Sequence, residues 1–253
     1  MLLNLAALAL AVAPAQGDEG ANADILRDCA AHSETPAAAP TGWTLVDASG
    51  IKTPADLLLA LPQGQRAAIH NGSFEGTDLR ALAPLLAGGC LADTNLDGTN
   101  WEGSEIPSLR LVRVSLTGAN ARRVRWPGMS TYGANLAGSD FSGAHLPDFR
   151  FVSAWQGADF GDTTFRGANL AGASFACGIT IDVWCINGAP GFAGADLTNA
   201  DISGFWLWDR HNVAGAVLDR TVIAPASFAH LGDARIAGPL RMAENFTSPY
   251  PQE

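Results

Sequence analysis

The sequence lacks the motifs of common catalytic sites and is poor in lysine and cysteine. It contains no Gly-x-Ser-x-Gly or His-x-x-x-His pattern and no phosphate-cradling glycine loop. Lys52 is the only lysine among 15 basic residues, and the 4 cysteines include no Cys-x-x-Cys pair. No two histidines lie close together either, which argues against a zinc site. We therefore predict no metal, no cofactor and no enzymatic activity.

The charge balance also limits the function. The 253 residues carry a formal net charge of -10, with a pI near 4.8. This balance favours solubility and argues against general nucleic-acid affinity. Residues 91–240 hold 14 acidic residues against 10 arginines, a balance too even to imitate duplex phosphate well.

One feature dominates the middle of the chain: a mostly apolar residue recurs at every fifth position, and a usually small residue lies two places before it. This period is neither the 3.6 of a helix nor the 2 of a plain strand. The apolar positions are Leu91, Leu96, Trp101, Ile106, Leu111, Leu116, Ala121, Trp126, Thr131, Leu136, Phe141, Leu146, Phe151 and Gln156.

A period of five is explained by a short strand followed by a corner. If the small and the large residue both point inward, the residue between them points outward, as in a three-residue strand. The next two places often end in glycine, as in Ala137-Gly138 and Ala171-Gly172, and glycine suits a corner because it accepts a positive φ. Such a chain winds around an axis, and each coil hydrogen-bonds to the one below.

The repeat units resemble those of the pentapeptide-repeat family. The units Ala134-Asn135-Leu136, Ala158-Asp159-Phe160, Ala168-Asn169-Leu170 and Ala195-Asp196-Leu197 are similar to its A-(D/N)-L-x-x pattern. The resemblance covers roughly residues 69–228. It implies an all-β fold, a right-handed four-sided parallel β-helix with four repeats per turn and the Leu or Phe stacked inside.

The other segments are predicted to cap or interrupt this array. Residues 18–68 form an N-terminal cap, because an open solenoid end exposes its core and strand edges. We expect a helical insertion at 80–87, a loop insertion at 176–191, and a C-terminal cap and tail at 229–253. The apolar stretch Val222–Phe228 suits the end-to-end homodimer that the resemblance implies.

Within the N-terminal cap, three short elements are predicted. Trp43, Leu45 and Val46 indicate a strand, and a short helix is expected near Ala23–Ala31. Thr53 as N-cap and Pro54 at the first helical position mark a second helix ending at Leu61.

Residues 1–17 are predicted to be a secretory signal peptide. The apolar run Leu2–Ala13 is followed by a small-x-small cleavage site at Ala13-Pro14-Ala15, although no Lys or Arg precedes the run. The run is too short to span a membrane. We expect a periplasmic or secreted protein, and the alternative is a short buried N-terminal helix.

The four cysteines are consistent with export. An even number of cysteines in an exported chain indicates disulfides, and four cysteines allow three pairings. We favour Cys177 with Cys185, closing a short loop, and Cys29 with Cys90, tying the N-terminal segment to the first full coil. The alternative is four buried thiols in a cytoplasmic protein.

The best candidate binding site lies where the repeat is least regular. Trp184 lies in the cysteine loop, and Phe205, Trp206, Trp208, Arg210 and His211 follow further along the chain. Departures from local regularity and exposed tryptophans are both enriched at binding sites. The alternative is that the rings fill a widened coil and bury the loop.

Two sets of charged residues are weaker candidates. Residues twenty apart stack on successive coils, which would bring Asp140 near Asp159 or Asp162, as in β-helix enzymes that act on polysaccharides. Several arginines look like an anion or partner site, but their phases distribute them as a girdle around a coil: Arg110, Arg113, Arg122, Arg123 and Arg125.

Three functions remain. The favoured one is an exported, non-enzymatic interaction or scaffold module that binds a protein or glycan partner, with neither nucleic-acid binding nor stable membrane insertion. The second is a DNA mimic that inhibits or protects DNA gyrase in the cytoplasm, as the resemblance implies for some members. The third is a β-helix polysaccharide enzyme.

Overall fold

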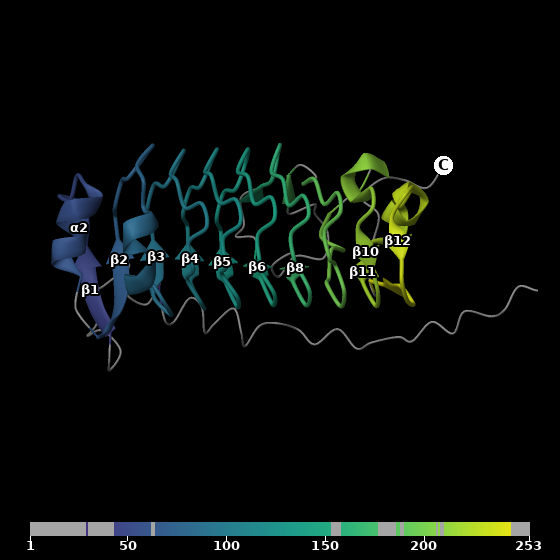
Figure 1. Cartoon of the computed structure of the whole chain (residues 1–253), viewed down its shortest axis with the longest axis horizontal. Helices are drawn as coiled ribbons and strands as arrows, with labels where there is room; N and C mark the ends of the chain where they lie inside the picture. The colour runs from purple at the N-terminus through teal and green to yellow at the C-terminus, as the bar shows by residue number, and fades with distance from the viewer. Residues whose placement is uncertain are drawn as a thin grey trace, which may run out of the picture.

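The computed structural model describes Cys29 and residues 43–61, 64–152, 158–176, 186–187, 190–205, 207 and 210–243. Short parallel strands stack as successive rungs along one long axis (Figure 1). The main sheet has seven strands: β1 (Trp43–Asp47), β2 (Arg66–His70), β3 (Cys90–Ala92), β4 (Arg110–Val112), β5 (Ser130–Tyr132), β6 (Arg150–Val152) and β8 (Ser174–Ala176).

The strand register confirms a four-sided coil of twenty residues. Leu91 pairs with Leu111, and Leu111 pairs with Thr131. Parallel bridges with the same spacing occur on the other three sides of each coil, at Asn95–Ser115, Asn100–Asn120 and Glu105–Arg125. The fold is therefore the predicted four-sided parallel β-helix.

Both inward positions are buried as predicted in the described repeats between residues 91 and 151. Trp101, Trp126 and Phe141 are at most 1% exposed, and the ring centroids of the two tryptophans lie 5.6 Å apart, edge to face. A small polar residue at an inward position can hydrogen-bond within its own turn. The hydroxyl of Thr99, for example, donates to the carbonyl of Leu96 at 2.5 Å. Thr131, at another inward position, differs, because its buried Oγ1 has no hydrogen-bond partner in the described part of the chain.

The corners use the left-handed backbone region. Gly118 and Gly138 have φ of 65° and 66° there, and the N–H of Gly118 donates to Ala137 O on the next coil at 2.8 Å. Arg113, Arg123 and Asp162 occupy equivalent corners with φ of 53°, 54° and 58°. Glycine removes the Cβ clash at this conformation, which explains its recurrence at the end of the repeat.

The N-terminal end contains the predicted elements, but the sheet begins earlier than expected. Helix α2 (Pro54–Ala60) has Thr53 as its N-cap, whose hydroxyl accepts from Asp56 N at 3.1 Å. Strand β1 pairs in parallel with β2, so the first rung lies inside the segment that the sequence assigned to a cap. Of the helix expected near 23–31, only Cys29 is among the described residues, and it is helical.

The predicted insertion at 80–87 is confirmed as a 3₁₀ helix, η1 (Arg80–Leu85). A second irregularity lengthens one coil, because Phe151 pairs with Phe175 rather than with a residue twenty positions on. Strand β7 (Ala158–Asp159) pairs there with β9 (Ile186–Asn187). Most of the loop predicted at 176–191 lies outside the described residues.

The C-terminal end extends beyond the predicted limit of 228. Strands β10 (Val217–Leu218) and β11 (Val222–Ile223) pair in parallel with β12 (Arg235–Ile236) and β13 (Arg241–Met242). The 3₁₀ helices η2 (Arg210–Val213) and η3 (Pro225–His230) interrupt these last coils. Within the described ranges, no helix is both long and apolar enough for a membrane span.

Candidate binding surfaces

The structure describes only part of the aromatic site predicted from the sequence. Trp184, Trp206 and Trp208 lie outside the described residues, so that prediction is untested for them. Arg210 begins η2, and His211 is exposed on the same short helix.

Phe205 belongs to the core and not to the surface. It is 1% exposed, and its ring centroid lies 5.2 Å from that of Phe160 and 5.0 Å from that of Phe175. The alternative prediction, that the ring fills a coil, therefore holds for Phe205. Its ring cannot contact a partner at the surface.

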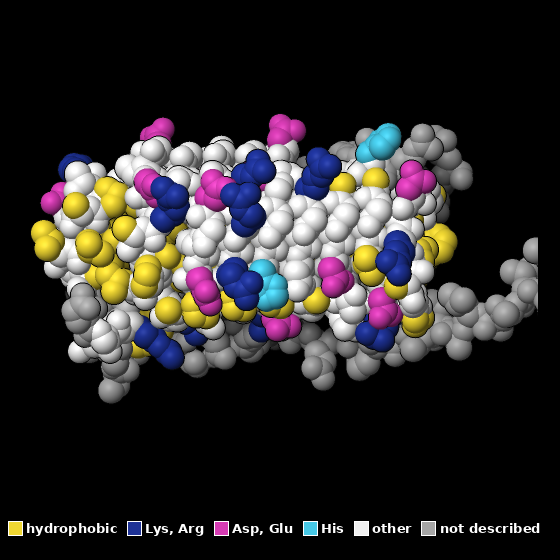
Figure 2. Space-filling view, viewed as in Figure 1, with side chains coloured by type: hydrophobic (Ala, Val, Ile, Leu, Met, Phe, Trp, Pro, Cys, Tyr) yellow, Lys and Arg dark blue, Asp and Glu magenta, His cyan; other side chains and the backbone are white. Residues whose placement is uncertain are grey.

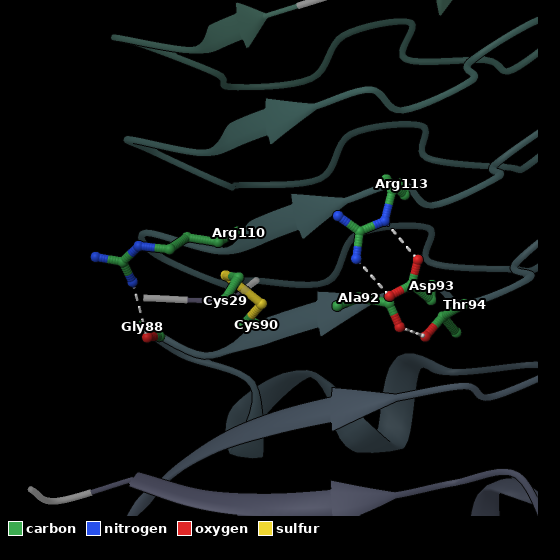
Figure 3. The surroundings of a disulfide bond; sticks show 8 residues. All are labelled: Cys29, Gly88, Cys90, Ala92, Asp93, Thr94, Arg110 and Arg113. Atoms are coloured by element: carbon green, nitrogen blue, oxygen red, sulfur yellow. Dashed lines mark hydrogen bonds and ion pairs between the residues drawn. A yellow bond between two sulfur atoms is a disulfide. The ribbon is translucent and has the colours of Figure 1, made fainter. Parts of the chain in front are cut away.

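The pairing predicted for the N-terminal cysteines is confirmed. Cys29 and Cys90 form a disulfide, with their Cα atoms 5.9 Å apart (Figure 3). Cys90 opens β3, where its neighbour Leu91 points into the core, so the sulfur projects from the outer face of the sheet. Cys177 and Cys185 lie outside the described residues.

The outer face of the main sheet is apolar, a feature that the sequence analysis missed. Its residues Ala68, Cys90, Ala92 and Val112 join Cys29 in a hydrophobic cluster separate from the core of the coil. All five are at most 1% exposed. The sequence carries no clear signal for it, because the equivalent outward position on the other sides also holds proline or alanine, as at Pro107, Pro127 and Ala137.

One aromatic side chain at the edge of this face contacts two arginines. The guanidinium carbons of Arg66 and Arg110 lie 5.8 and 5.7 Å from the ring centroid of Trp43. Arg110 also donates to the carbonyl of Gly88 at 3.1 Å (Figure 3). Cation–π contacts of this kind contribute about 0.5–1 kcal/mol at exposed sites. They fix Trp43 against the rungs above it.

The other arginines of the predicted girdle are mostly paired with acids. Arg113 makes two hydrogen bonds of 2.6 Å to the Asp93 carboxylate one coil below. Arg122 pairs with Asp140 at 3.3 Å, and Arg123 pairs with Glu102. On the face shown in Figure 2, acidic and basic side chains are interspersed. These contacts join successive coils and leave no concentrated basic patch on that face.

The carboxylate of Asp78 has a strongly lowered pKa. The Arg80 guanidinium hydrogen-bonds the Asp78 carboxylate, and this lowers the pKa of Asp78 to about 2. Both side chains are half exposed at the start of η1, so the pair stabilises a turn at the surface and does not mark a buried acid.

The outward acids stabilise the repeat turns. The carboxylate oxygen of Asp140 accepts from Ser142 N at 2.8 Å, and Asp196 accepts in the same way from Thr198 N. Neither Asp159 nor Asp162 is the direct partner of Asp140 on the next coil. Asp140 bridges to Thr164 because the intervening coil is longer than twenty residues. This pattern explains the preference for Asn and Asp at the outward position.

The histidines do not converge on a site in the described part of the chain. His145 lies at the outward position predicted for it, and its Nδ1 is 3.2 Å from Asn169 Nδ2. Across the described ranges, no group of three or more His, Cys, Asp or Glu side chains is placed to hold a metal ion.

Both ends of the solenoid expose apolar side chains. At the N-terminal end, Leu45, Leu58 and Leu59 are exposed, and Leu59 on α2 is 86% exposed. Figure 2 shows hydrophobic side chains gathered at this end. At the other end, the exposed apolar residues are Phe228, Ile236 and Met242.

Comparison with known proteins supports the repeat assignment. A family model described as pentapeptide repeats, in 8 copies, matches residues 110–148 and 153–176. A search of curated proteins finds no match.

Solved structures with low sequence identity are similar over most of their length. QnrB1, a plasmid-mediated fluoroquinolone resistance protein, matches over 68% of this chain and 91% of its own, with 14% identity and a TM-score of 0.33. Rfr23 from the cyanobacterium Cyanothece 51142 matches over 63% and 88%, with 15% identity and a TM-score of 0.25. HetL from the cyanobacterium Nostoc sp. strain PCC 7120 matches over 70% and 89%, with 18% identity and a TM-score of 0.20.

The repeat copies and the stacked coils lead to one assignment. The coils between β3 and β6 each contain four five-residue units, since their strands pair at a spacing of twenty residues. Residues 110–148 and 153–176 match the pentapeptide-repeat model, and the described coils that contain them form a four-sided parallel β-helix.

Proposed function

We propose that the protein is an exported, non-enzymatic interaction module that acts in the periplasm or outside the cell. The observation that carries the proposal is the disulfide between Cys29 and Cys90. Disulfides persist in oxidising compartments and are rare in the cytosol. The apolar run Leu2–Ala13 and the small-x-small site after it agree with export.

The outer surface supports a non-enzymatic role. Catalytic acids are typically held with a perturbed pKa beside a partner group in a cleft. Here, Asp140, Asp196 and Asp201 each accept a hydrogen bond from the backbone N–H two residues on. Asp93 and Glu102 pair with arginines of the next coil. These carboxylates maintain the solenoid, and a protein of this kind acts by presenting its surface.

The N-terminal end is the surface that we propose binds a partner. Leu58 and Leu59 project from α2, and Leu45 is exposed on β1, the terminal strand of the main sheet. Exposed apolar side chains beside a sheet edge suit a protein partner better than a polar glycan. The partner is therefore proposed to be another protein.

Two experiments test this proposal. Residues 1–42 fused to a reporter enzyme that is active only after export should yield active reporter. An inactive cytoplasmic fusion would contradict export.

Leu58→Glu with Leu59→Glu should abolish cross-linked adducts formed in the native host while the solenoid stays folded. Arg125→Glu, at an exposed position midway along the solenoid, is the matched control. Unchanged adducts in the leucine variant would contradict the proposed surface.

A homodimer through the C-terminal coil is part of the same proposal. Only part of the predicted stretch Val222–Phe228 is available to form it, because Val222 and Ile223 pair with β13. Phe228, Ile236 and Met242 are exposed instead. Two copies meeting there would bury these side chains in a symmetric contact.

A further inference from the structure

Strand β1 ends the main sheet, and its outer edge is open. Figure 1 shows it at the end of the row of rungs, and among the described strands it pairs only with β2. A strand at the edge of a sheet presents a row of backbone N–H and C=O groups on which another chain can pair. Natural sheets block such an edge with proline, lysine or a bulge. The sequence of β1, Trp-Thr-Leu-Val-Asp, contains neither residue, and all five residues pair with β2 without a bulge.

The hydrogen bonds of the first rungs show which backbone groups face the open edge. The N–H of Ala48 donates to the carbonyl of His70 at the end of β2 at 2.8 Å. In a parallel ladder every second residue bonds to the same neighbour, so the N–H and C=O groups of Thr44 and Val46 also point toward β2. The groups of the three alternate residues point away from β2: Trp43, Leu45 and Asp47.

The side chains of these three residues determine which kind of strand fits the edge. They share the outer face of the sheet, because side chains alternate along a strand and the residue between Leu45 and Asp47 is buried. Leu45 is 37% exposed at the middle of β1. At one end, the guanidinium carbon of Arg66 lies 5.8 Å from the ring centroid of Trp43. At the other end, the exposed Asp47 carboxylate accepts from the N–H of Ser49 at 3.1 Å, which lowers the pKa of Asp47. The face is therefore positive at one end of β1, apolar in the middle and negative at the other end.

We propose that the open edge of β1 binds an extended segment of the partner protein as an additional antiparallel strand, with an apolar residue opposite Leu45. Antiparallel pairing is slightly more stable per residue than parallel pairing. An acidic residue of the segment then lies opposite Trp43, near Arg66, and a basic residue lies opposite Asp47. The segment therefore carries the pattern basic-x-apolar-x-acidic.

This pattern favours a different protein over a second copy of the chain. In an antiparallel pair of two β1 strands, Trp43 and not a basic residue would lie opposite Asp47. In strand addition, main-chain hydrogen bonds provide the affinity and alternate side chains provide the specificity. The inference rests on the proposed function, because it takes the N-terminal end as the partner site and specifies what that site recognises.

Amide hydrogen exchange in the full-length, oxidised protein tests the pairing with a defined probe. The probe is a peptide with the core Lys-Thr-Leu-Thr-Glu, and in the matched control peptide the lysine and the glutamate are exchanged. At a concentration of about ten times its dissociation constant, the probe should slow exchange about tenfold at Leu45 and Asp47. Exchange at Thr44 and Val46, which already bond to β2, should not change. Equal slowing at all four amides, or no slowing at millimolar peptide, would overturn the proposal.

Variants of the protein test the charge pattern and the occupant. Arg66→Glu should remove the preference for the probe over the control peptide, whereas Arg125→Glu, at an exposed position away from β1, should keep it. An unchanged preference in the Arg66 variant would contradict the assigned register. Slowing at Leu45 and Asp47 that grows with protein concentration without peptide would identify a second copy as the occupant, and would also overturn the proposal.

Cross-linking in the native host separates this inference from the proposed function. Leu45→Pro removes one edge N–H and leaves the bonds to β2 intact, because proline is tolerated on an edge strand where its nitrogen faces solvent. It should abolish the same adducts as Leu58→Glu with Leu59→Glu, with the solenoid still folded by circular dichroism. If only the double variant on α2 loses the adducts, the N-terminal end binds its partner without strand pairing, and this inference fails alone. If neither variant loses them, the proposed surface itself fails.

Discussion

Replacing Phe165 by Ala should destabilise the middle of the solenoid more than any surface change. Phe165 is 0% exposed, and five other phenylalanine rings lie within 6.5 Å of its centroid. Truncating a buried Phe costs about 3–5 kcal/mol through lost transfer free energy and a cavity. Each aromatic contact adds about 0.5–1.5 kcal/mol. The loss in free energy of unfolding should therefore lie near the top of that range, at about 4–5 kcal/mol.

Urea unfolding followed by circular dichroism measures this loss. Phe228→Ala is the matched control, because its ring is 51% exposed on η3 and should change the free energy by about 0.5 kcal/mol or less. Stability in a repeat array depends on contacts between neighbouring coils. A broadened or two-step transition is thus expected if the coils around residue 165 unfold first. A loss below about 1 kcal/mol for Phe165→Ala would refute the account of the core.

Three further predictions concern a corner, an acid and the C-terminal end. Gly138→Ala should cost about 1 kcal/mol in urea unfolding because its φ is 66°, whereas Gly50→Ala, with no atom within 4 Å of a new Cβ, should cost nothing. Arg80→Gln should raise the pKa of Asp78 from about 2 toward its ordinary value of ~3.9 in an NMR titration. Since folding lowers this pKa, the stability that the pair contributes is present above pH ~4 and is lost as the pH falls toward 2, and an unchanged titration would contradict the assigned cause. Phe228→Asp should convert a dimer to a monomer in light scattering, and a wild-type monomer would contradict the proposed dimer.

The repeat architecture could be predicted because one physical constraint recurs. A five-residue unit buries two side chains and turns a corner, so Leu91, Leu111 and Phe151 appear at fixed spacing, and the structure buries all three. The N-cap Thr53 and the following proline were equally informative, because a helix start is a local property.

The irregular features were harder to predict because they depend on distant contacts. The long coil before Phe175 shifts the register, and the sequence showed only a slip in phase without the number of inserted residues. Phe205 is an aromatic residue in an irregular stretch and is therefore a binding candidate in the sequence. Only its ring contacts show that it belongs to the core. Edge strand β1 was assigned to a cap because its five residues are too few to show the five-residue spacing of the repeat.

The surface was the least predictable part. Outward acids such as Asp140 look like catalytic candidates in sequence, and their backbone hydrogen bonds show a structural role. The apolar patch around Ala92 and Val112 has no clear signal in the sequence, because the equivalent position on other sides also holds proline or alanine, as at Pro107 and Ala137. Recognising this patch requires knowing which of the four sides of the coil each repeat forms, and the sequence alone determines this only approximately.

The mass of the protein from separated periplasmic and cytoplasmic fractions of its native host tests the central claim most directly. We predict a periplasmic species that lacks about the first fifteen to seventeen residues, and in which peptide mapping without reduction finds Cys29 linked to Cys90. A full-length cytoplasmic protein with both thiols free would contradict the exported, disulfide-bonded module.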